Sequence, residues 1–151
     1  MILKYKAVSD KIGKEIPAPF YATPGSAAMD LCACVDAPVE IAPRALVSIP
    51  TGIAIALPSP AYVALVFARS GLGIRHGISL SNGVGVIDSD YRGEIRVGLC
   101  NFSGEPYTVS PGERIAQLVL HPVLLLPVTE VDTLDETERG TGGFGSTGKG
   151  V

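Results

Sequence analysis

Apolar and polar side chains alternate with a period of two along several short segments, a pattern that predicts β-strands rather than helices. Residues 94–99 alternate cleanly, so that their apolar side chains share one face. Residues 52–57 alternate large and small apolar side chains. Residues 62–67 and 115–120 are more uniformly apolar, as expected of strands that are buried on both faces.

Turn signals rich in glycine and proline separate these segments, for example at residues 58–60, 103–106 and 110–112. Many short strands at this spacing are typical of a β-sandwich, a jelly roll or a barrel. One short helix is expected from Ser70 toward His76, with Ser70 as its N-cap. An α/β fold would need amphipathic helices of ten or more residues between the strands, and the sequence shows no such pattern.

Composition narrows the class of protein. The length of 151 residues predicts one domain, and a hydrophobic content of 46% excludes a disordered chain. The net charge of −3 argues against a general binder of nucleic acid or of anionic membranes, because such proteins carry an excess of cations. Only 18% of the residues are charged, which suggests that another subunit covers part of the surface.

The three cysteines, Cys32, Cys34 and Cys100, do not follow the spacing of a zinc site, and two strand neighbours are poorly placed for a disulfide. We interpret them as free thiols in a reducing compartment. The sequence shows neither a signal-peptide stretch at the first residues nor an apolar run long enough to span a membrane. These features predict a cytoplasmic protein.

The last residues differ in composition from the rest. Residues 139–151 contain six glycines and follow an acidic linker, so we expect one domain over residues 1–138 and a flexible arm over residues 139–151. The glycines match a dinucleotide fingerprint and nearly match a phosphate-binding loop. Both motifs require a strand before the loop and a helix after it, and the sequence offers neither, so both are rejected.

Three polar positions stand in unusual surroundings. Arg69 and Ser70 follow an apolar strand. They form either a phosphate site, because a guanidinium group binds phosphate oxygens in pairs of hydrogen bonds, or a capped turn with a surface arginine. Asp88 follows two apolar residues, within a glycine-rich stretch that suggests a hairpin at Asn82. Asp88 is either a general base or a turn residue. Gln117 interrupts an apolar strand and serves either the core or a ligand.

Five segments resemble, in order, the five motifs of the trimeric dUTP pyrophosphatase (dUTPase) family, and together they span nearly the whole chain. They are residues 25–31, 68–73, 82–93, 111–117 and 139–148. Two departures concern turn geometry, since Ala68 stands where proline often precedes the Arg-Ser pair, and Ala28-Met29 replaces a glycine and a variable residue. Neither departure removes a side chain with a chemical role.

The resemblance implies an all-β fold, a distorted jelly roll or β-clip with one short helix. It also implies a homotrimer with active sites between subunits and a glycine-rich C-terminal arm that closes over them. The implied reaction is the hydrolysis of dUTP to dUMP and pyrophosphate, which limits uracil in DNA and supplies dUMP for dTMP synthesis. The implied cofactor is Mg²⁺, held mainly by the substrate's phosphates.

The resemblance also implies residue roles. Asp88 would activate the water that attacks the α-phosphorus, with Gln117 near that phosphate, and Tyr91 would lie beneath the deoxyribose and exclude a ribose hydroxyl. Uracil would be recognised by Asn82 and the backbone of Val86 and Ile87, and phosphates would be bound by Arg69, Ser70 and Gly71 of a neighbouring subunit. Closure of the arm would involve Arg139, Phe144, Ser146 and Thr147. Arg96 would make a further substrate contact, and Asp30 would contact Mg²⁺ through water.

Two alternatives remain at this point. One is a dCTP deaminase, or a bifunctional relative, on the same fold. The other is a non-catalytic trimeric module that binds nucleotides. Asp88 and the arm favour the pyrophosphatase over a deaminase, and the intact Tyr91, Gln117 and Phe144 argue against a non-catalytic module. Neither a nucleic-acid polymer nor a membrane is an expected partner.

Overall fold

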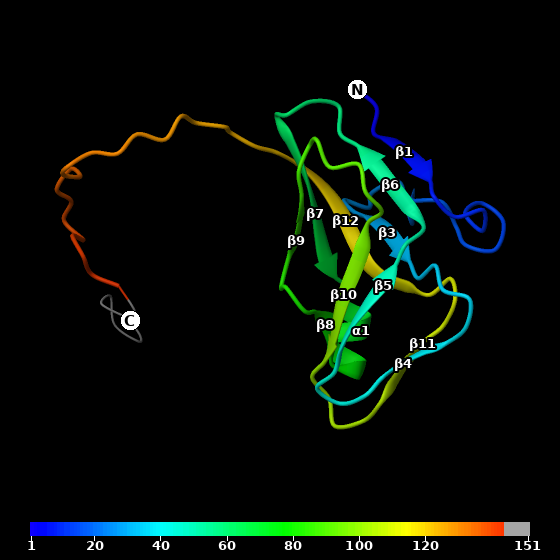
Figure 1. The fold of residues 1–151 in the computed structure, drawn as a ribbon. Coiled ribbons are helices and arrows are strands. Elements are labelled where there is room, and N and C mark those ends of the chain that lie inside the picture. The colour runs from blue at the N-terminus through cyan, green and yellow to red at the C-terminus, as the bar shows by residue number, and fades with distance from the viewer. Residues whose placement is uncertain (144–151) are drawn as a thin grey trace.

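The computed structural model describes residues 1–143, which form short antiparallel strands and one helix (Figure 1). This matches the strand-rich fold that the alternation predicts. The elements are β1 (Lys4–Ala7), β2 (Phe20–Tyr21), β3 (Met29–Cys32), β4 (Val39–Ile41), β5 (Leu46–Pro50), β6 (Ile53–Ala56), β7 (Tyr62–Ala68), α1 (Ser70–His76), β8 (Ile78–Leu80), β9 (Gly85–Ile87), β10 (Arg96–Asn101), β11 (Tyr107–Val109) and β12 (Arg114–Pro122).

The strands form one five-stranded sheet, one three-stranded sheet and two strand pairs. The large sheet has the order β2-β3-β12-β7-β9, and the three-stranded sheet has the order β5-β10-β8. The pairs are β1 with β6 and β4 with β11. Strand β12 lies at the centre of the large sheet, between β3 and β7, and β9 forms one of its edges. Most neighbouring strands are far apart in the sequence, so the core depends on long-range contacts.

Apolar side chains from residues 29–118 fill a single core. Ile95, Val97 and Leu99 are only 3%, 2% and 1% exposed, which confirms that the alternating segment around β10 buries one face. Residues 115–120 include Ile115 and Leu118, at 1% and 2% exposed, from the centre of the large sheet. Burying such side chains is the main favourable contribution to the stability of a small β domain.

Asn101 is a polar side chain that is fully buried at the end of β10. Its Nδ2 donates to the carbonyl oxygens of Ile41 (2.9 Å) and Glu105 (2.7 Å). Its Oδ1 accepts from the backbone N–H (2.9 Å) and the hydroxyl (2.7 Å) of Ser103. The buried amide therefore has a partner for each of its four hydrogen bonds, and it ties β4 to the turn that follows β10.

The predicted helix is present, but its cap differs from the expectation. The N-cap is Arg69, in extended conformation and without a side-chain capping bond, and Ser70 is the first helical residue. The helix therefore begins one residue earlier than a Ser70 N-cap would place it. At the other end Gly77 adopts a left-handed conformation with φ of 67°, and its N–H reaches the oxygen of Gly73, so the helix stops there.

The segment around Asn82 is not the hairpin that its Asn-Gly pair suggested. Strand β8 pairs with β10, and β9 pairs with β7, so the turn carries the chain from one sheet to the other. Gly83 supplies the required positive φ of 73°, and the N–H of Val84 bonds to the oxygen of Asn82 at 2.8 Å. The turn is tight, as predicted, but the pairing of its flanking strands is decided by the core.

The chain after Pro122 extends away from the body (Figure 1). This segment, residues 123–128, is apolar, and four of its side chains are 73–98% exposed: Leu124, Leu125, Leu126 and Val128. A contiguous apolar stretch of this kind on a globular protein marks an interaction surface.

Within residues 1–143, no helix is long and apolar enough to cross a membrane.

All three cysteines are free, as predicted. Cys32 and Cys100 are buried, and Cys34 is half-buried. Burial raises the pKa of the Cys32 thiol, and the nearby Asp30 carboxylate raises it further. Burial of this kind is typical of a structural cysteine.

Candidate active site

A cavity of about 290 Å³ opens between β9, the loop that follows it and β10. The structure brings six of the predicted site residues together in its lining: Asn82, Val86, Ile87, Asp88, Tyr91 and Arg96. Val66 of β7 and Gly98 of β10 complete opposite walls. The cavity combines apolar walls with a few polar groups, which is typical of a site for a small ligand.

Strand β9 presents free backbone groups to this cavity. It pairs with β7 along one side only, with Val86 opposite Leu65, and no other strand of the described residues pairs with its outer side. An edge strand of this kind offers N–H donors and carbonyl acceptors in a fixed row. Such a row matches the alternating donors and acceptors along the edge of a nucleobase.

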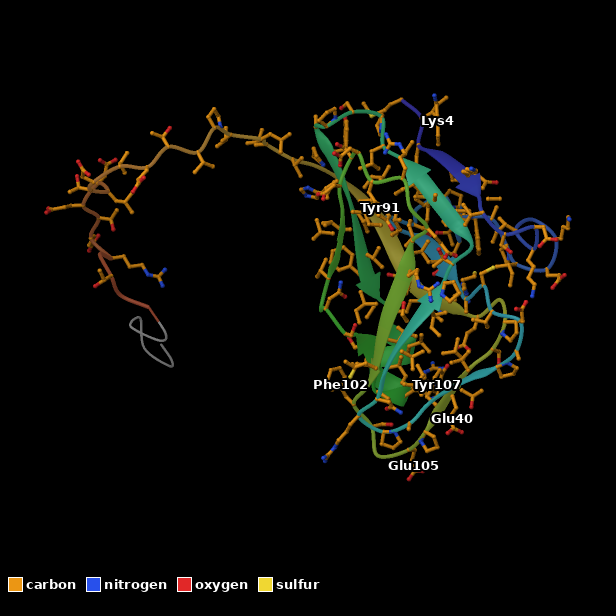
Figure 2. The ribbon with its side chains drawn as sticks, in the orientation of Figure 1. Lys4, Glu40, Tyr91, Phe102, Glu105 and Tyr107 are labelled. Carbon is orange, nitrogen blue, oxygen red and sulfur yellow. The ribbon has the colours of Figure 1, made fainter. Side chains whose placement is uncertain are left out.

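Tyr91 is held in a defined position at the mouth of the cavity, in the upper part of the body in Figure 2. Its hydroxyl donates to the backbone oxygen of Glu94 at 3.0 Å. The ring also lies against Gly93, where an added Cβ would stand only 2.4 Å from the phenol oxygen. Gly93 is therefore required for this ring position, and the ring closes one side of the cavity.

Glu94 also lines the cavity, and sequence reasoning did not single it out. Its Oε1 accepts from the backbone N–H of Gly52 at 2.8 Å, and its Oε2 pairs with Nη1 of Arg96 at 3.4 Å. Arg96 donates further to Ser48, from Nε to the hydroxyl and from Nη2 to the carbonyl, both at 3.1 Å. The contact with Gly52 is distant in sequence, so no local motif could have revealed it.

A second polar cluster lies outside the cavity, where β7 ends and β12 begins. Asp30 of β3 is 7% exposed and contacts two guanidinium groups. Its Oδ1 lies 3.1 Å from Nε of Arg69, and its Oδ2 lies 3.1 Å from Nη1 of Arg114. Nη1 of Arg69 also donates to the backbone oxygen of Arg114 at 3.1 Å. We call Asp30, Arg69 and Arg114 the arginine cluster.

Other predicted residues lie beside the arginine cluster rather than in the cavity. Gln117 is half-buried on β12, directly opposite Asp30 in the strand register. Ser70 and Gly71 follow Arg69 in the first turn of α1. The predicted site residues of one chain therefore fall into two groups, one around the cavity and one around the arginine cluster.

The predicted arm is only partly described. Arg139 is exposed, and its Nε donates to the oxygen of Gly142 at 2.9 Å, within a local turn far from both groups. Phe144, Ser146 and Thr147 lie outside the described residues.

Within residues 1–143, no group of three or more histidine, cysteine, aspartate or glutamate side chains is placed to hold a metal ion.

Comparison with known proteins gives a consistent result. Residues 14–148 match the sequence profile of the dUTPase family. The deoxyuridine 5'-triphosphate nucleotidohydrolase of Hahella chejuensis is 51% identical over 146 residues, which covers 97% of this chain and 96% of the relative. The solved dUTPase of Staphylococcus bacteriophage 80alpha with dUPNHPP is 25% identical, with a TM-score of 0.84 over 98% of this chain and 99% of that one.

A further structural neighbour is a mutant dUTPase from phage phi11 of S. aureus, whose structure describes the coordination of a structural Mg(II) ion. It is 20% identical, with a TM-score of 0.77 over 90% of this chain and 100% of that one. These neighbours confirm the predicted all-β fold with one short helix.

Proposed function

The chain belongs to the dUTPase family, and from that premise we propose that it hydrolyses dUTP to dUMP and pyrophosphate at the cavity beside β9. The observation that carries the proposal is the gathering of six predicted site residues, five of them from the motif at residues 82–93, around one cavity of nucleoside size. The chain is thus a dUTP diphosphatase. Its reaction limits the uracil that reaches DNA and supplies dUMP for dTMP synthesis.

The nucleoside binds in the cavity, where the base and the sugar are read by different elements. The exposed edge of β9 and the side chain of Asn82 pair with the uracil edge, and a base with the wrong donor pattern would leave these groups unpaired. Tyr91 lies beneath the deoxyribose, where its fixed ring leaves no room for a 2'-hydroxyl. Base and sugar selection are therefore separate functions of β9 and Tyr91.

Asp88 acts as the general base. It follows Ile87 at the end of β9 and lines the cavity, in a position to accept a proton from a water molecule beside the α-phosphate. The water oxygen forms a bond to the α-phosphorus, the bond from that phosphorus to the bridging oxygen breaks, and pyrophosphate leaves with the bond's electron pair. Gln117 is proposed to hydrogen-bond near the same phosphate.

Magnesium fits this chain as an ion that travels with the triphosphate. Mg²⁺ keeps several waters and is usually bound by one or two carboxylates together with substrate phosphates, and the described residues provide no larger ligand cluster. When bound, the ion would neutralise charge on the leaving pyrophosphate. A water-mediated contact between Asp30 and the ion remains a prediction.

The complete site forms between copies of the chain. Arg69, Ser70 and Gly71 do not line the cavity of their own chain, although the reaction needs cations around the phosphates. The exposed apolar segment, residues 123–128, supports association because its burial against another copy would remove leucine and valine side chains from water. A cyclic trimer places the arginine cluster of one copy at the cavity of the next, with the arm over the bound phosphates.

The proposed enzyme acts on free nucleotides, and its three free cysteines suit a reducing compartment, so we place it in the cytoplasm.

The reaction is tested by measuring pyrophosphate release with Mg²⁺ from dUTP, UTP, dTTP and dCTP. Release from dUTP alone supports the proposed reaction, base readout and sugar selection. Asp88→Asn should retain the fold and nucleotide binding but lose most of the turnover, and full turnover by this variant would remove Asp88 from the role of base. Ammonia release from dCTP would instead indicate a deaminase, and silence on all four nucleotides would indicate a non-catalytic module.

The shared site is tested by mixing two inactive variants, Asp88→Asn and Arg69→Ala, after joint unfolding and refolding. If residues 88 and 69 of one site come from different copies, random mixing leaves about a quarter of the sites with both residues intact. Activity should then reappear in the mixture. If both residues served the same site from one chain, the mixture would stay as inactive as its components.

A further inference from the structure

We propose that Asn82 is a site of spontaneous deamidation, and that this modification weakens the recognition of uracil. The chain has two asparagines: Asn82, which precedes a glycine, and Asn101, which precedes a phenylalanine. The modification itself follows from the chemistry of the turn at Asn82 and needs no ligand. Its effect on activity rests on the proposed function, in which the amide of Asn82 pairs with the base.

The reaction uses only the backbone of the next residue and water. Solvent base removes the backbone N–H proton of Gly83, and the nitrogen attacks Cγ of Asn82. The new C–N bond closes a succinimide ring, and the side-chain nitrogen takes a proton from water and leaves as ammonia. Water then opens the ring at either of its carbonyl carbons, which gives aspartate or isoaspartate. Glycine hinders the attack least of all residues, because it has no Cβ.

The structure leaves the side chain of Asn82 accessible to this attack. Asn82 and Gly83 are both exposed. An added Cβ at Gly83 would meet nothing within 4 Å, so there is open space beside the attacking nitrogen. Within residues 1–143 the amide of Asn82 has no hydrogen-bond partner, whereas the amide of Asn101 makes four hydrogen bonds. The fold therefore protects one asparagine and not the other.

The backbone of the turn also offers little resistance. The N–H of Gly83 donates to the oxygen of Leu80 at 3.3 Å, which is longer than an ordinary N–H···O bond. The N–H of Val84 reaches the oxygen of Asn82 across Gly83, whose φ is 73°, and a γ-turn with positive φ is a strained conformation. Opening this turn costs little, because the long bond is weak and the strain is released. The nitrogen of Gly83 can then approach Asn82.

The conformation of the turn requires the residue that makes Asn82 reactive. The positive φ at Gly83 is one that L side chains rarely adopt, and the turn carries the chain from β8 in one sheet to β9 in the other. A bulkier residue after Asn82 would slow the attack but would strain this connection. The tight turn and the chemical lability therefore have the same cause.

Deamidation changes what residue 82 offers to a base in the cavity. Asn82 lines the cavity, where its amide carries both N–H donors and an acceptor oxygen, whereas a carboxylate only accepts. The uracil edge presents a carbonyl oxygen on each side of one N–H group, so the new carboxylate would face a carbonyl oxygen. It would also add negative charge beside Asp88. We expect the modified enzyme to bind dUTP about tenfold more weakly, the effect of leaving one polar group unpaired.

The experiment incubates the full-length folded protein in heavy-oxygen water at mildly alkaline pH and follows its peptides by mass spectrometry. Cleavage after arginine separates the two asparagines, since residues 76–92 contain Asn82 and residues 97–114 contain Asn101. Peptide 76–92 should lose its amide nitrogen, gain one heavy oxygen and contain isoaspartate. Peptide 97–114 is the internal control and should stay unchanged, because the amide of Asn101 is buried and fully bonded.

The rate in the folded protein is compared with that in a synthetic peptide of residues 76–92. The two rates should agree within about tenfold, because an exposed turn opens at little cost, and a slower reaction in the protein would show that the turn protects Asn82 and overturn the proposal. Aspartate without isoaspartate would show direct hydrolysis of the amide and would also overturn it.

Gly83→Ala tests the attacking nitrogen. Its methyl group has room in the folded chain but hinders the attack, so deamidation should be several times slower than in the wild-type protein. An unchanged rate would contradict attack by the backbone nitrogen of residue 83. The same substitution in the synthetic peptide keeps this test valid should the variant protein fail to fold.

Two further measurements test the effect on uracil recognition. The analogue dUpNHpp, at about ten times its dissociation constant, leaves about a tenth of the sites free, so deamidation should slow about tenfold. Asn82→Asp, which reproduces one product, should raise the KM for dUTP about tenfold with little change in kcat. An unslowed reaction in protein that binds dUpNHpp, or an unchanged KM, would overturn the link to uracil. If the wild-type protein fails to bind dUpNHpp, the proposed function fails, while the peptide masses still decide whether Asn82 is modified.

Discussion

Replacing Gly93 by alanine should weaken the enzyme's discrimination against ribonucleotides without unfolding it. The new Cβ would stand 2.4 Å from the Tyr91 hydroxyl oxygen and 2.6 Å from Cζ. Ordinary contact begins at 3.4 Å, so the phenol end must retreat by about 1 Å. Tyr91 is 47% exposed, and its ring can move outward without disturbing the core.

The magnitude follows from what holds the ring. On the proposed role of Tyr91, a 2'-hydroxyl can enter the wild-type site only if the ring leaves its position, which breaks the bond from its hydroxyl to the backbone oxygen of Glu94. That bond contributes about 1 kcal/mol, or about fivefold in an equilibrium constant. In the variant the ring is already displaced, so we expect the ratio of kcat/KM for dUTP to that for UTP to fall by about fivefold or more.

The assay is pyrophosphate release from dUTP and UTP under identical conditions, together with a thermal unfolding curve. Gly104→Ala is the matched control, because a Cβ at Gly104 meets nothing within 4 Å. The control should keep both the specificity ratio and the melting temperature. An unchanged dUTP to UTP ratio in folded Gly93→Ala would refute the idea that a fixed Tyr91 ring selects the sugar.

Three further predictions concern stability and the arm. Asn101→Leu should lower the free energy of unfolding by about 3 kcal/mol, because it leaves the buried carbonyl of Ile41 and the partly buried groups of Ser103 and Glu105 without this partner; a loss below about 1 kcal/mol in urea titrations would contradict this. Burial and the bond to Glu113 raise the pKa of Tyr107 from 10.0 to about 12, so the folded state holds this proton more tightly. The stability this provides is complete below pH 10.0 and lost as the pH rises to about 12, and Tyr107→Phe should flatten that part of the curve. Deleting residues 139–151 should leave the melting temperature unchanged and reduce dUTP turnover about 100-fold, and full activity would refute closure by the arm.

The sequence predicted those features that depend on local pattern. The strand alternation, the short helix from Ser70 and the tight turn at Gly83 follow from side-chain periodicity and from glycine's backbone freedom. The grouping of Asn82, Asp88 and Tyr91 at one cavity also follows, since they belong to one continuous motif.

What the sequence did not predict depends on residues that are distant along the chain. Asp30 and Arg114 are 84 residues apart, and only the pairing of β3 with β12 shows that they form one cluster with Arg69. Glu94 reaches Gly52 across 42 positions in the same way. The missing hairpin has a similar origin, because the core pairs β8 and β9 with strands of two different sheets.

The exposed apolar segment, residues 123–128, has a consequence for gene dosage. If the site is shared between copies, as proposed, a newly made copy folds its own core but carries an incomplete active site and uncovered leucines until it meets other copies. At low expression most molecules would remain single, because association depends on concentration. Cellular activity should therefore rise more steeply than protein amount over that range, and halving the dose of the gene should cost more than half of the activity.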